Sequence, residues 1–173
     1  VYVGGGTPTV LSAQDLKRIL SEINFRATEL TVEAGRPDTI TREKLSVLKE
    51  MGVTRICVNP QTFCERTLKA IGRNHGVKEI LSAYKLAVEF GFDVNLDLIA
   101  GLPGESFQTF KKSLQAAIEM APANITVHAL ALKRGSTLTI QKQKNKSISL
   151  EVPPPKEVEK MISFANTELL KEG

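Results

Sequence analysis

Strand-like and helix-like segments alternate along most of this 173-residue chain, and the alternation limits the folds open to it. Apolar residues at helical spacing predict helices over residues 13–23, 41–51, 64–71, 77–90, 107–120 and 157–171. Runs rich in β-branched residues predict strands over residues 1–3, 30–35, 53–59, 92–99 and 125–132. Such an order implies right-handed crossovers and a parallel sheet. The class is α/β, either an open doubly wound sheet or part of a (β/α) barrel.

Three regions are expected along the chain. Residues 1–133 form the α/β body, residues 134–155 form a flexible loop rich in Pro and Lys, and residues 156–173 form a C-terminal amphipathic helix. The first three residues already have strand character and lead directly into a glycine turn. We therefore expect the chain to be a piece of a larger domain.

Composition excludes several classes of protein. The chain has two cysteines, too few for a disulfide-rich secreted scaffold or for a metal site of three cysteines. Its 23 Lys and Arg are scattered among 19 Asp and Glu, and aromatic residues make up 5%, so no nucleic-acid partner is expected. The sequence has no export signal and no membrane-spanning segment. We expect a cytoplasmic protein with reduced thiols and no membrane contact.

Polar residues follow several of the predicted strands. In a parallel α/β fold the functional groups lie at the carboxyl ends of the strands. The glycine turn over residues 4–6 lets a backbone approach a ligand closely, although it has neither the P-loop nor the dinucleotide-binding spacing. Glu33, Gln61 and Asp97 belong to the next three strand ends, and Arg73 follows the Gln61 loop. These side chains are expected to converge.

Each charged group also has a purely structural interpretation. Glu33 binds a ligand or forms a structural ion pair, and the sequence alone does not distinguish these two roles. Asp97 accepts hydrogen bonds from ribose hydroxyls, or pairs with a helix N-terminus or a lysine. Arg73 grips a carboxylate in a bidentate pair or is a solvated surface arginine. Together the groups suit a ligand with an amine, a carboxylate and ribose hydroxyls.

The remaining candidates for metal ligands have simpler interpretations. His75 and His128 are isolated in the sequence and are expected to be structural. Cys57 lies in a predicted strand and is expected to be a small buried hydrophobe. The spacing of Cys57 and Cys64 is not that of a metal-binding pair.

Six motifs occur in a distinctive order: GGGTP at 4–8, TVEAGRPDTIT at 31–41, RICVNPQTF at 55–63, IGRNH at 71–75, NLDLIAGLPG at 95–104 and TVHALALKRGS at 126–136. Over roughly residues 1–136 this series closely resembles the radical S-adenosylmethionine (SAM) proteins of the oxygen-independent coproporphyrinogen III oxidase group. VEAGRPDTIT, NPQT and VHALALKR most resemble its coproporphyrinogen dehydrogenase branch.

The resemblance implies a fold and a chemistry. The fold is a partial (β/α)6 barrel, here truncated before or within its second strand. The family binds a [4Fe-4S] cluster through a C-x-x-x-C-x-x-C loop, and SAM chelates the open iron. Its 5′-deoxyadenosyl radical removes hydrogen from the propionates of coproporphyrinogen III, and loss of CO₂ leaves protoporphyrinogen IX. A flavodoxin or ferredoxin type of electron donor is implied.

The resemblance also implies roles for individual residues. Gly5, Gly6 and Thr7 match the turn at the methionine end of the cofactor. The matching side chains of the cofactor site are Glu33, Gln61, Arg73 for the carboxylate and Asp97 for the ribose, with a backbone contact to adenine at Ala131.

The cluster loop is absent from this chain, and Cys57 and Cys64 cannot replace it. The chain alone is therefore expected to hold no cluster and to be inactive.

Other functions stay open. Close relatives of the oxidase are thought to bind and deliver haem. A radical SAM enzyme with another substrate, such as RNA, and an unrelated α/β barrel enzyme are further alternatives.

Overall fold

The computed structural model describes residues 1–24, 27–131 and 151–172. One parallel sheet has the strand order β1-β2-β3-β4-β5. Its strands are β1 (Tyr2–Val3), β2 (Thr31–Glu33), β3 (Arg55–Gln61), β4 (Asp93–Ala100) and β5 (Asn124–Ala129). The α/β class with a parallel sheet, predicted from the alternating pattern, is confirmed.

The helices follow the strands in alternation. They are α1 (Ala13–Ser21), α2 (Arg42–Glu50), α3 (Glu65–Ala70), α4 (Val77–Glu89), α5 (Phe107–Glu119) and α7 (Pro155–Glu172). Two 3-10 turns were not predicted, η1 (Pro8–Val10) and η2 (Pro37–Thr39). Both begin at a proline, whose fixed φ suits the first position of a helical turn.

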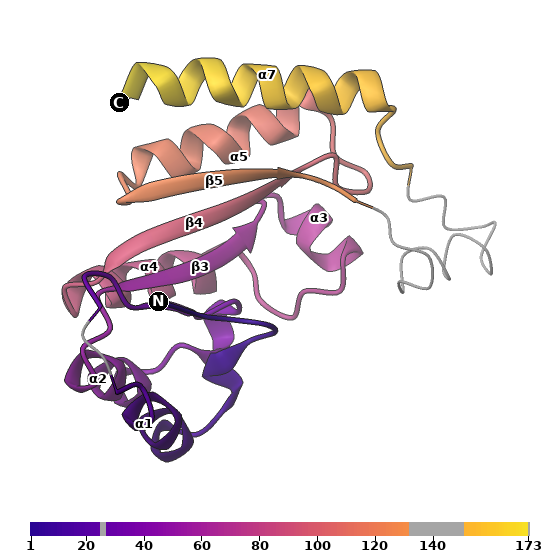
Figure 1. The fold of residues 1–173 in the computed structure, drawn as a ribbon. Coiled ribbons are helices and arrows are strands. Elements are labelled where there is room, and N and C mark those ends of the chain that lie inside the picture. Colours follow the sequence, from indigo (N-terminus) through magenta and orange to yellow (C-terminus); the bar gives the residue numbers. More distant parts are fainter. Residues whose placement is uncertain (25–26, 132–150, 173) are drawn as a thin grey trace. The chain divides into compact units, whose positions relative to one another are not determined.

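The described residues fall into two compact units. Unit 1 consists of Val1–Pro60, His75–Asp97 and Ala121–Thr126, and unit 2 consists of Gln61–Asn74, Leu98–Met120 and Val127–Gly173. In unit 1, α1 and α2 lie side by side (Figure 1). Their facing leucines are almost completely buried, namely Leu16, Leu20, Leu45 and Leu48.

The strands of unit 1 have one apolar and one polar face. Along β3 the buried Ile56 and Val58 alternate with Cys57 and Asn59, which point to the opposite side. In β4 the same alternation puts buried apolar residues opposite Asn95 and Asp97. The register of β2 and β3 places Glu33 opposite Cys57. The polar faces of neighbouring strands therefore collect the candidate site residues of this unit.

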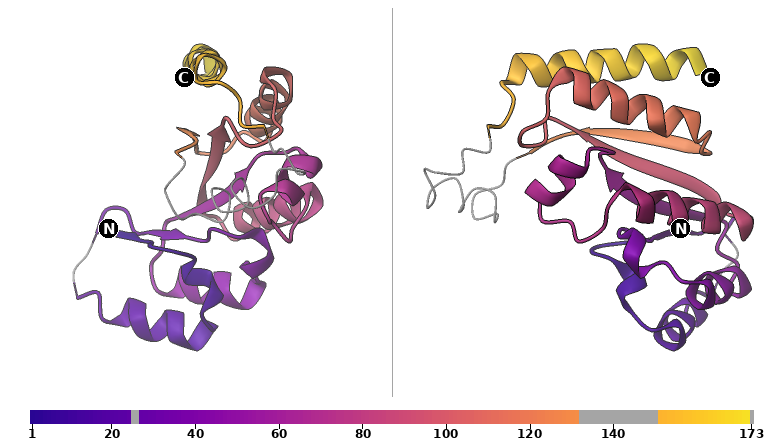
Figure 2. Two further views of the ribbon diagram at one scale, coloured as in Figure 1. Left: turned by 90° about the vertical axis from the view of Figure 1, so that its right-hand side faces the viewer. Right: turned by 180° about the vertical axis from the view of Figure 1, so that it is seen from behind.

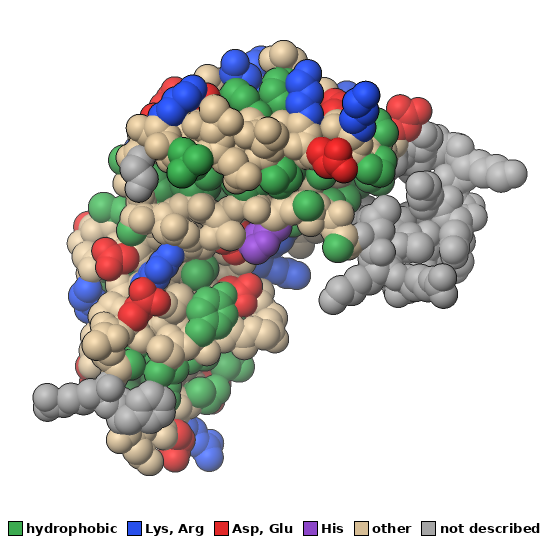
Figure 3. Space-filling view, turned by 45° about the horizontal axis from the view of Figure 1, so that its top comes forward, with side chains coloured by type: hydrophobic (Ala, Val, Ile, Leu, Met, Phe, Trp, Pro, Cys, Tyr) green, Lys and Arg blue, Asp and Glu red, His purple; other side chains and the backbone are tan. Residues whose placement is uncertain are grey.

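Unit 2 contains the pair of long helices α5 and α7, which run side by side in Figures 1 and 2. The helices bury Phe110 and Leu114 from α5 and Met161 and Ala165 from α7, each at most 1% exposed. The rings of Phe107 and Phe164 meet edge to face with their centroids 5.3 Å apart. Figure 3 shows basic and acidic side chains interspersed over α7.

Some predicted boundaries were wrong. The strand predicted over residues 53–59 is displaced, because the Val53 N–H donates to the Leu48 carbonyl (3.0 Å) in the turn that ends α2. β3 therefore begins at Arg55 and extends to Gln61. The strand predicted over residues 30–35 is shorter, since Gly35 has φ 41° and turns the chain after Glu33.

The last helix begins at Pro155, two residues earlier than predicted. Most of the loop predicted over residues 134–155 lies outside the described residues, so the three-region division stays a prediction. Among the residues that the structure describes, no helix is long and apolar enough to cross a membrane.

Candidate functional site

The glycine turn after β1 is open on one side and crowded on the other. Gly5 and Gly6 have φ values of 97° and 136°, and a Cβ on either would meet no atom within 4 Å. A Cβ on Gly4 would lie 2.4 Å from Cε1 of Tyr2 and 2.8 Å from Oε2 of Glu33. The turn thus offers exposed backbone to a ligand, and Gly4 permits the close approach of Glu33. Thr7 follows and is the residue directly before η1.

Glu33 ends β2 and is held by two neutral donors. The Gly5 N–H donates to Oε2 (3.4 Å), and Nδ2 of Asn59 donates to Oε1 (3.1 Å). Within the described part of the chain no ion pair involves Glu33. The structural ion pair considered above is therefore not formed by these residues. Among the described residues this half-buried carboxylate is hydrogen-bonded by two amides, and it can also accept from a cationic ligand group.

Asn59 was not predicted as a site residue. Its side chain lies on the same face of β3 as Cys57 and is 6% exposed. The neighbouring carboxylate can only accept, so Nδ2 must face Glu33. The other amide atom, Oδ1, is buried and has no hydrogen-bond partner among the described residues. Alternation along the strand was the available signal, but it does not show which polar side chain reaches a neighbour.

Asp97 lies on the polar face of β4. Nδ2 of Asn95 donates to its Oδ1 at 2.6 Å, and Asp97 is half-buried while Asn95 is 4% exposed. Like Glu33, this carboxylate is oriented by a buried asparagine that sequence reasoning missed. The arrangement leaves carboxylate oxygens able to accept further hydrogen bonds, as ribose hydroxyls would require.

Cys57 and Tyr2 are close enough to both carboxylates, Glu33 and Asp97, to feel their negative charge. Cys57 is 5% exposed, which confirms its predicted burial. Burial, followed by the negative charge of Asp97, raises the pKa of the Cys57 thiol. Partial desolvation of the Tyr2 hydroxyl also raises its pKa, with further contributions from Cys57 and Glu33. The Cys57 thiol and the Tyr2 hydroxyl are therefore both neutral near pH 7.

The other three predicted residues belong to unit 2. Gln61 ends β3 with φ 66°, an uncommon value for a residue with a side chain, and is 8% exposed. Its Oε1 has no hydrogen-bond partner within the described ranges. Arg73 is half-buried after α3, where its N–H donates to the Leu68 carbonyl (3.0 Å). Ala131 is exposed beyond the end of β5.

A buried acid in unit 2, Glu105, is hydrogen-bonded to Thr62, the residue after Gln61. Oγ1 of Thr62 donates to Oε1 of Glu105 at 2.7 Å and lies 3.0 Å from Oγ of Ser113. Glu105 is 4% exposed, and burial raises its pKa to about 7. This cluster anchors the residue after Gln61, and no sequence pattern predicted it.

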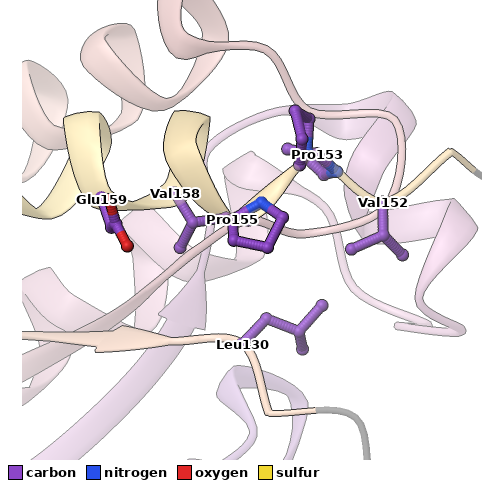
Figure 4. A pocket seen from close by; sticks show the side chains of 8 residues that line it. Leu130, Val152, Pro153, Pro155, Val158 and Glu159 are labelled. Carbon is purple, nitrogen blue, oxygen red and sulfur yellow. The ribbon is translucent and has the colours of Figure 1, made fainter.

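A pocket of about 570 Å³ lies at the ends of β4 and β5 in unit 2 (Figure 4). Leu130, Val152, Pro155 and Val158 surround it in the figure, and Glu159 supplies a carboxylate. A Cβ on the adjoining Gly101 would lie 2.7 Å from Cγ2 of Val158, so glycine is needed there. The lining is mostly apolar and offers packing surface more than hydrogen bonds.

The histidines occupy different environments. His75 is 4% exposed, with Nδ1 3.5 Å from Oδ1 of Asp38, as a structural histidine would be. His128 is exposed on β5. Among the residues that the structure describes, no group of three His, Cys, Asp or Glu side chains is placed to hold a metal ion.

The chain belongs to the radical SAM superfamily, whose family model matches residues 1–117. It is 45% identical over 155 residues to the oxygen-independent coproporphyrinogen-III oxidase-like protein HemZ of Bacillus subtilis, covering 84% of this chain and 30% of that protein. It is 32% identical over 180 residues to the heme chaperone HemW of the same organism, covering 100% of this chain and 46% of HemW.

Solved structures show the same fold. Coproporphyrinogen III oxidase (HemN) from Escherichia coli, a radical SAM enzyme, superposes with a TM-score of 0.83 at 26% identity, covering 99% of this chain and 40% of HemN. Elp3 from the archaeon Methanocaldococcus infernus has a TM-score of 0.80 at 21% identity, over 95% of this chain and 43% of Elp3, and bears on the fold alone. The chain spans less than half the length of each of these proteins.

The family implies SAM and a [4Fe-4S] cluster, and the described residues fit these two groups differently. SAM has an ammonium group, a carboxylate and ribose hydroxyls. The open glycine turn and the carboxylates of Glu33 and Asp97 suit such a ligand. The cluster needs thiolates, whereas Cys57 is buried on β3 and Cys64 precedes α3. This chain fits the organic cofactor and not the cluster.

Proposed function

We propose that the protein containing this chain is a radical SAM enzyme that converts coproporphyrinogen III to protoporphyrinogen IX without oxygen, by oxidative decarboxylation in haem biosynthesis. The observation on which the proposal rests is the pair of carboxylates, Glu33 and Asp97, each oriented by an asparagine, with an open glycine turn beside Glu33. The 45% identity to a coproporphyrinogen-III oxidase-like protein supports the choice of substrate.

The chain's residues have distinct parts in this proposal. Gly5, Gly6 and Thr7 receive the methionine end of the cofactor, where Glu33 attracts the ammonium group. Asp97 accepts hydrogen bonds from the ribose hydroxyls. In unit 2, Arg73 binds the carboxylate, Gln61 contributes a neutral amide, and the Ala131 backbone contacts the adenine. When bound, SAM and the cluster supply the radical that removes hydrogen from the substrate.

Two partners belong to the same proposal. The substrate is a porphyrinogen with propionate side chains. Reduction of the cluster needs a one-electron donor, for which a flavodoxin or ferredoxin type of protein is proposed. The cluster ligands are provided outside the residues of this chain.

The direct test is turnover. Full-length protein with its cluster reconstituted anaerobically is incubated with coproporphyrinogen III, SAM and a reductant, and the porphyrins are separated after oxidation. The expected result is protoporphyrin together with 5′-deoxyadenosine. Formation of 5′-deoxyadenosine without any decarboxylated porphyrin would reject this substrate while leaving the radical chemistry in place.

Haem delivery is the second candidate function. It is favoured by the match to the heme chaperone HemW, which extends over the whole chain. The two candidates differ in what the protein does with porphyrins. Tight stoichiometric binding of haem, with no protoporphyrinogen formed in the assay above, would establish the carrier and reject the oxidase.

A further inference from the structure

Asn95 connects the Asp97 carboxylate to strand β5 inside unit 1. Its Nδ2 donates to Oδ1 of Asp97 at 2.6 Å. Its Oδ1 accepts from Oγ1 of Thr126 at 3.0 Å and also from Nδ2 of Asn124. Nδ2 of Asn124 lies 3.2 Å from Oγ1 of Thr126 as well. The four side chains therefore form one continuous hydrogen-bonded chain across two neighbouring strands.

The direction of each hydrogen bond in this chain is determined by its ends. A carboxylate only accepts, so the Asn95 amide must present Nδ2 to Asp97. The amide oxygen then faces β5, where Thr126 and Asn124 both donate to it. A reversed amide would place its oxygen against the carboxylate, and neither group would then donate a hydrogen. Asn95 is 4% exposed, so water does not offer it an alternative partner.

The hydrogen bond also limits how Asp97 can rotate. Asn95 and Asp97 are two residues apart on β4 and project from the same face of the strand. Asn95 is the hydrogen-bond donor to Asp97 among the described residues, and it engages Oδ1. Oδ2 and the second lone pair of Oδ1 remain able to accept from two vicinal hydroxyls. A half-buried carboxylate held in one rotamer loses less freedom when a ligand binds.

We infer that Asn95 is a positioning residue of the cofactor site: held by Thr126 and Asn124 of β5, it orients the Asp97 carboxylate toward the ribose hydroxyls of the cofactor. The inference rests on the proposed function, which assigns Asp97 to the cofactor. It adds three residues of unit 1 that act through Asp97 without touching the ligand. It also makes the affinity for ribose depend on β5.

The experiment measures binding of SAM, and of its 2′-deoxyribose analogue, to full-length protein with its cluster reconstituted, by calorimetry. Asp97→Ala is the reference variant and is expected to weaken SAM binding about 10- to 150-fold. Asn95→Leu keeps the volume but removes all three side-chain hydrogen bonds of Asn95, and roughly a tenfold loss of SAM affinity is expected. For the 2′-deoxy analogue, Asn95→Leu is expected to weaken binding at most about twofold, because the analogue already lacks one of the two hydroxyls that Asp97 would bind.

A matched pair on β5 tests the connection without touching Asn95. Thr126→Val removes the hydroxyl at nearly constant shape and is expected to weaken SAM binding about threefold. Thr126→Ser keeps the hydroxyl and is expected to recover most of that affinity. If Asn95→Leu fails to fold, the two Thr126 variants still test whether the hydrogen bond from β5 affects SAM binding.

The outcomes separate the inference from the proposed function. Unchanged SAM binding by Asp97→Ala would reject the site assignment itself. Weak binding by Asp97→Ala with natural affinity in Asn95→Leu and Thr126→Val would overturn the positioning role alone. Equal losses for SAM and the 2′-deoxy analogue in Asn95→Leu would also overturn it, because a general structural defect does not distinguish the two ligands.

Discussion

At the scale of single residues, the most unusual group is the Glu105 carboxyl in unit 2. Thr62 donates to one of its oxygens, and the other oxygen is buried without a hydrogen-bond partner among the described residues. Burial outweighs the Thr62 hydrogen bond and raises the pKa from 4.5 to about 7. Folding is therefore coupled to protonation at this site.

The stability of the chain should depend on pH through Glu105. Between pH 4.5 and about 7 the unfolded chain has ionised Glu105, whereas the folded chain keeps it protonated. The contribution of Glu105 to the free energy of unfolding is therefore complete below pH 4.5 and is lost as the pH rises to about 7. Glu105→Gln removes this titration, so the variant should gain stability relative to the natural chain as pH rises, by up to roughly 3 kcal/mol.

Denaturant unfolding of both chains across this range measures the effect. Glu159→Gln, at an exposed position on α7, serves as the control and should show no such trend. A difference between Glu105→Gln and the natural chain that does not change with pH would contradict the prediction.

Gly4 is the second residue whose surroundings make a prediction. A Cβ there overlaps the Tyr2 ring, which must shift, so Gly4→Ala should lower the free energy of unfolding by about 0.5–1.5 kcal/mol. Tyr2 is 60% exposed, and its ring can be removed to relieve the overlap. In a double-mutant cycle, Tyr2→Ala should therefore recover at least about 0.5 kcal/mol of the loss. Strict additivity of the two substitutions would exclude this cause.

At the scale of elements, the α5–α7 pair stabilises unit 2. Met161 is fully buried in that pair, whereas Leu170 on the same helix is 83% exposed. Met161→Ala should cost about 2–5 kcal/mol by leaving a cavity. Leu170→Ala should change stability by less than about 0.5 kcal/mol. Thermal and denaturant unfolding compare the two, and similar costs would show that α7 is not packed as described.

At the scale of the whole molecule, the chain has the fold of a radical SAM protein without enough cysteines for its cluster. Anaerobic reconstitution of the 173-residue chain with iron and sulfide should yield no stable four-iron cluster, because the family's loop needs three cysteines and the chain has two. EPR spectroscopy of the reduced sample is the measurement. A four-iron signal that changes when SAM is added would refute the prediction.

Local patterns in the sequence were sufficient for the α/β class, the order of elements and several site residues. Helix starts depend on contacts within a few residues: the side chains of Ser12 and Thr41 cap α1 and α2 by accepting from the N–H groups of Asp15 and Lys44. Glu33 and Asp97 stood out because a carboxylate in an apolar strand is costly without a partner. The sequence pattern predicts both at or near strand ends.

Tertiary structure alone decided what holds those carboxylates. Asn59 reaches Glu33 across 26 residues of sequence, and Thr126 reaches Asn95 across 31. The burial of Glu105 likewise depends on Thr62 and on α5. A polar residue in a strand has the same local pattern whether it faces water, a ligand or another side chain. Its partner is set by strand register and packing over long separations, and those contacts have no local signature in the sequence.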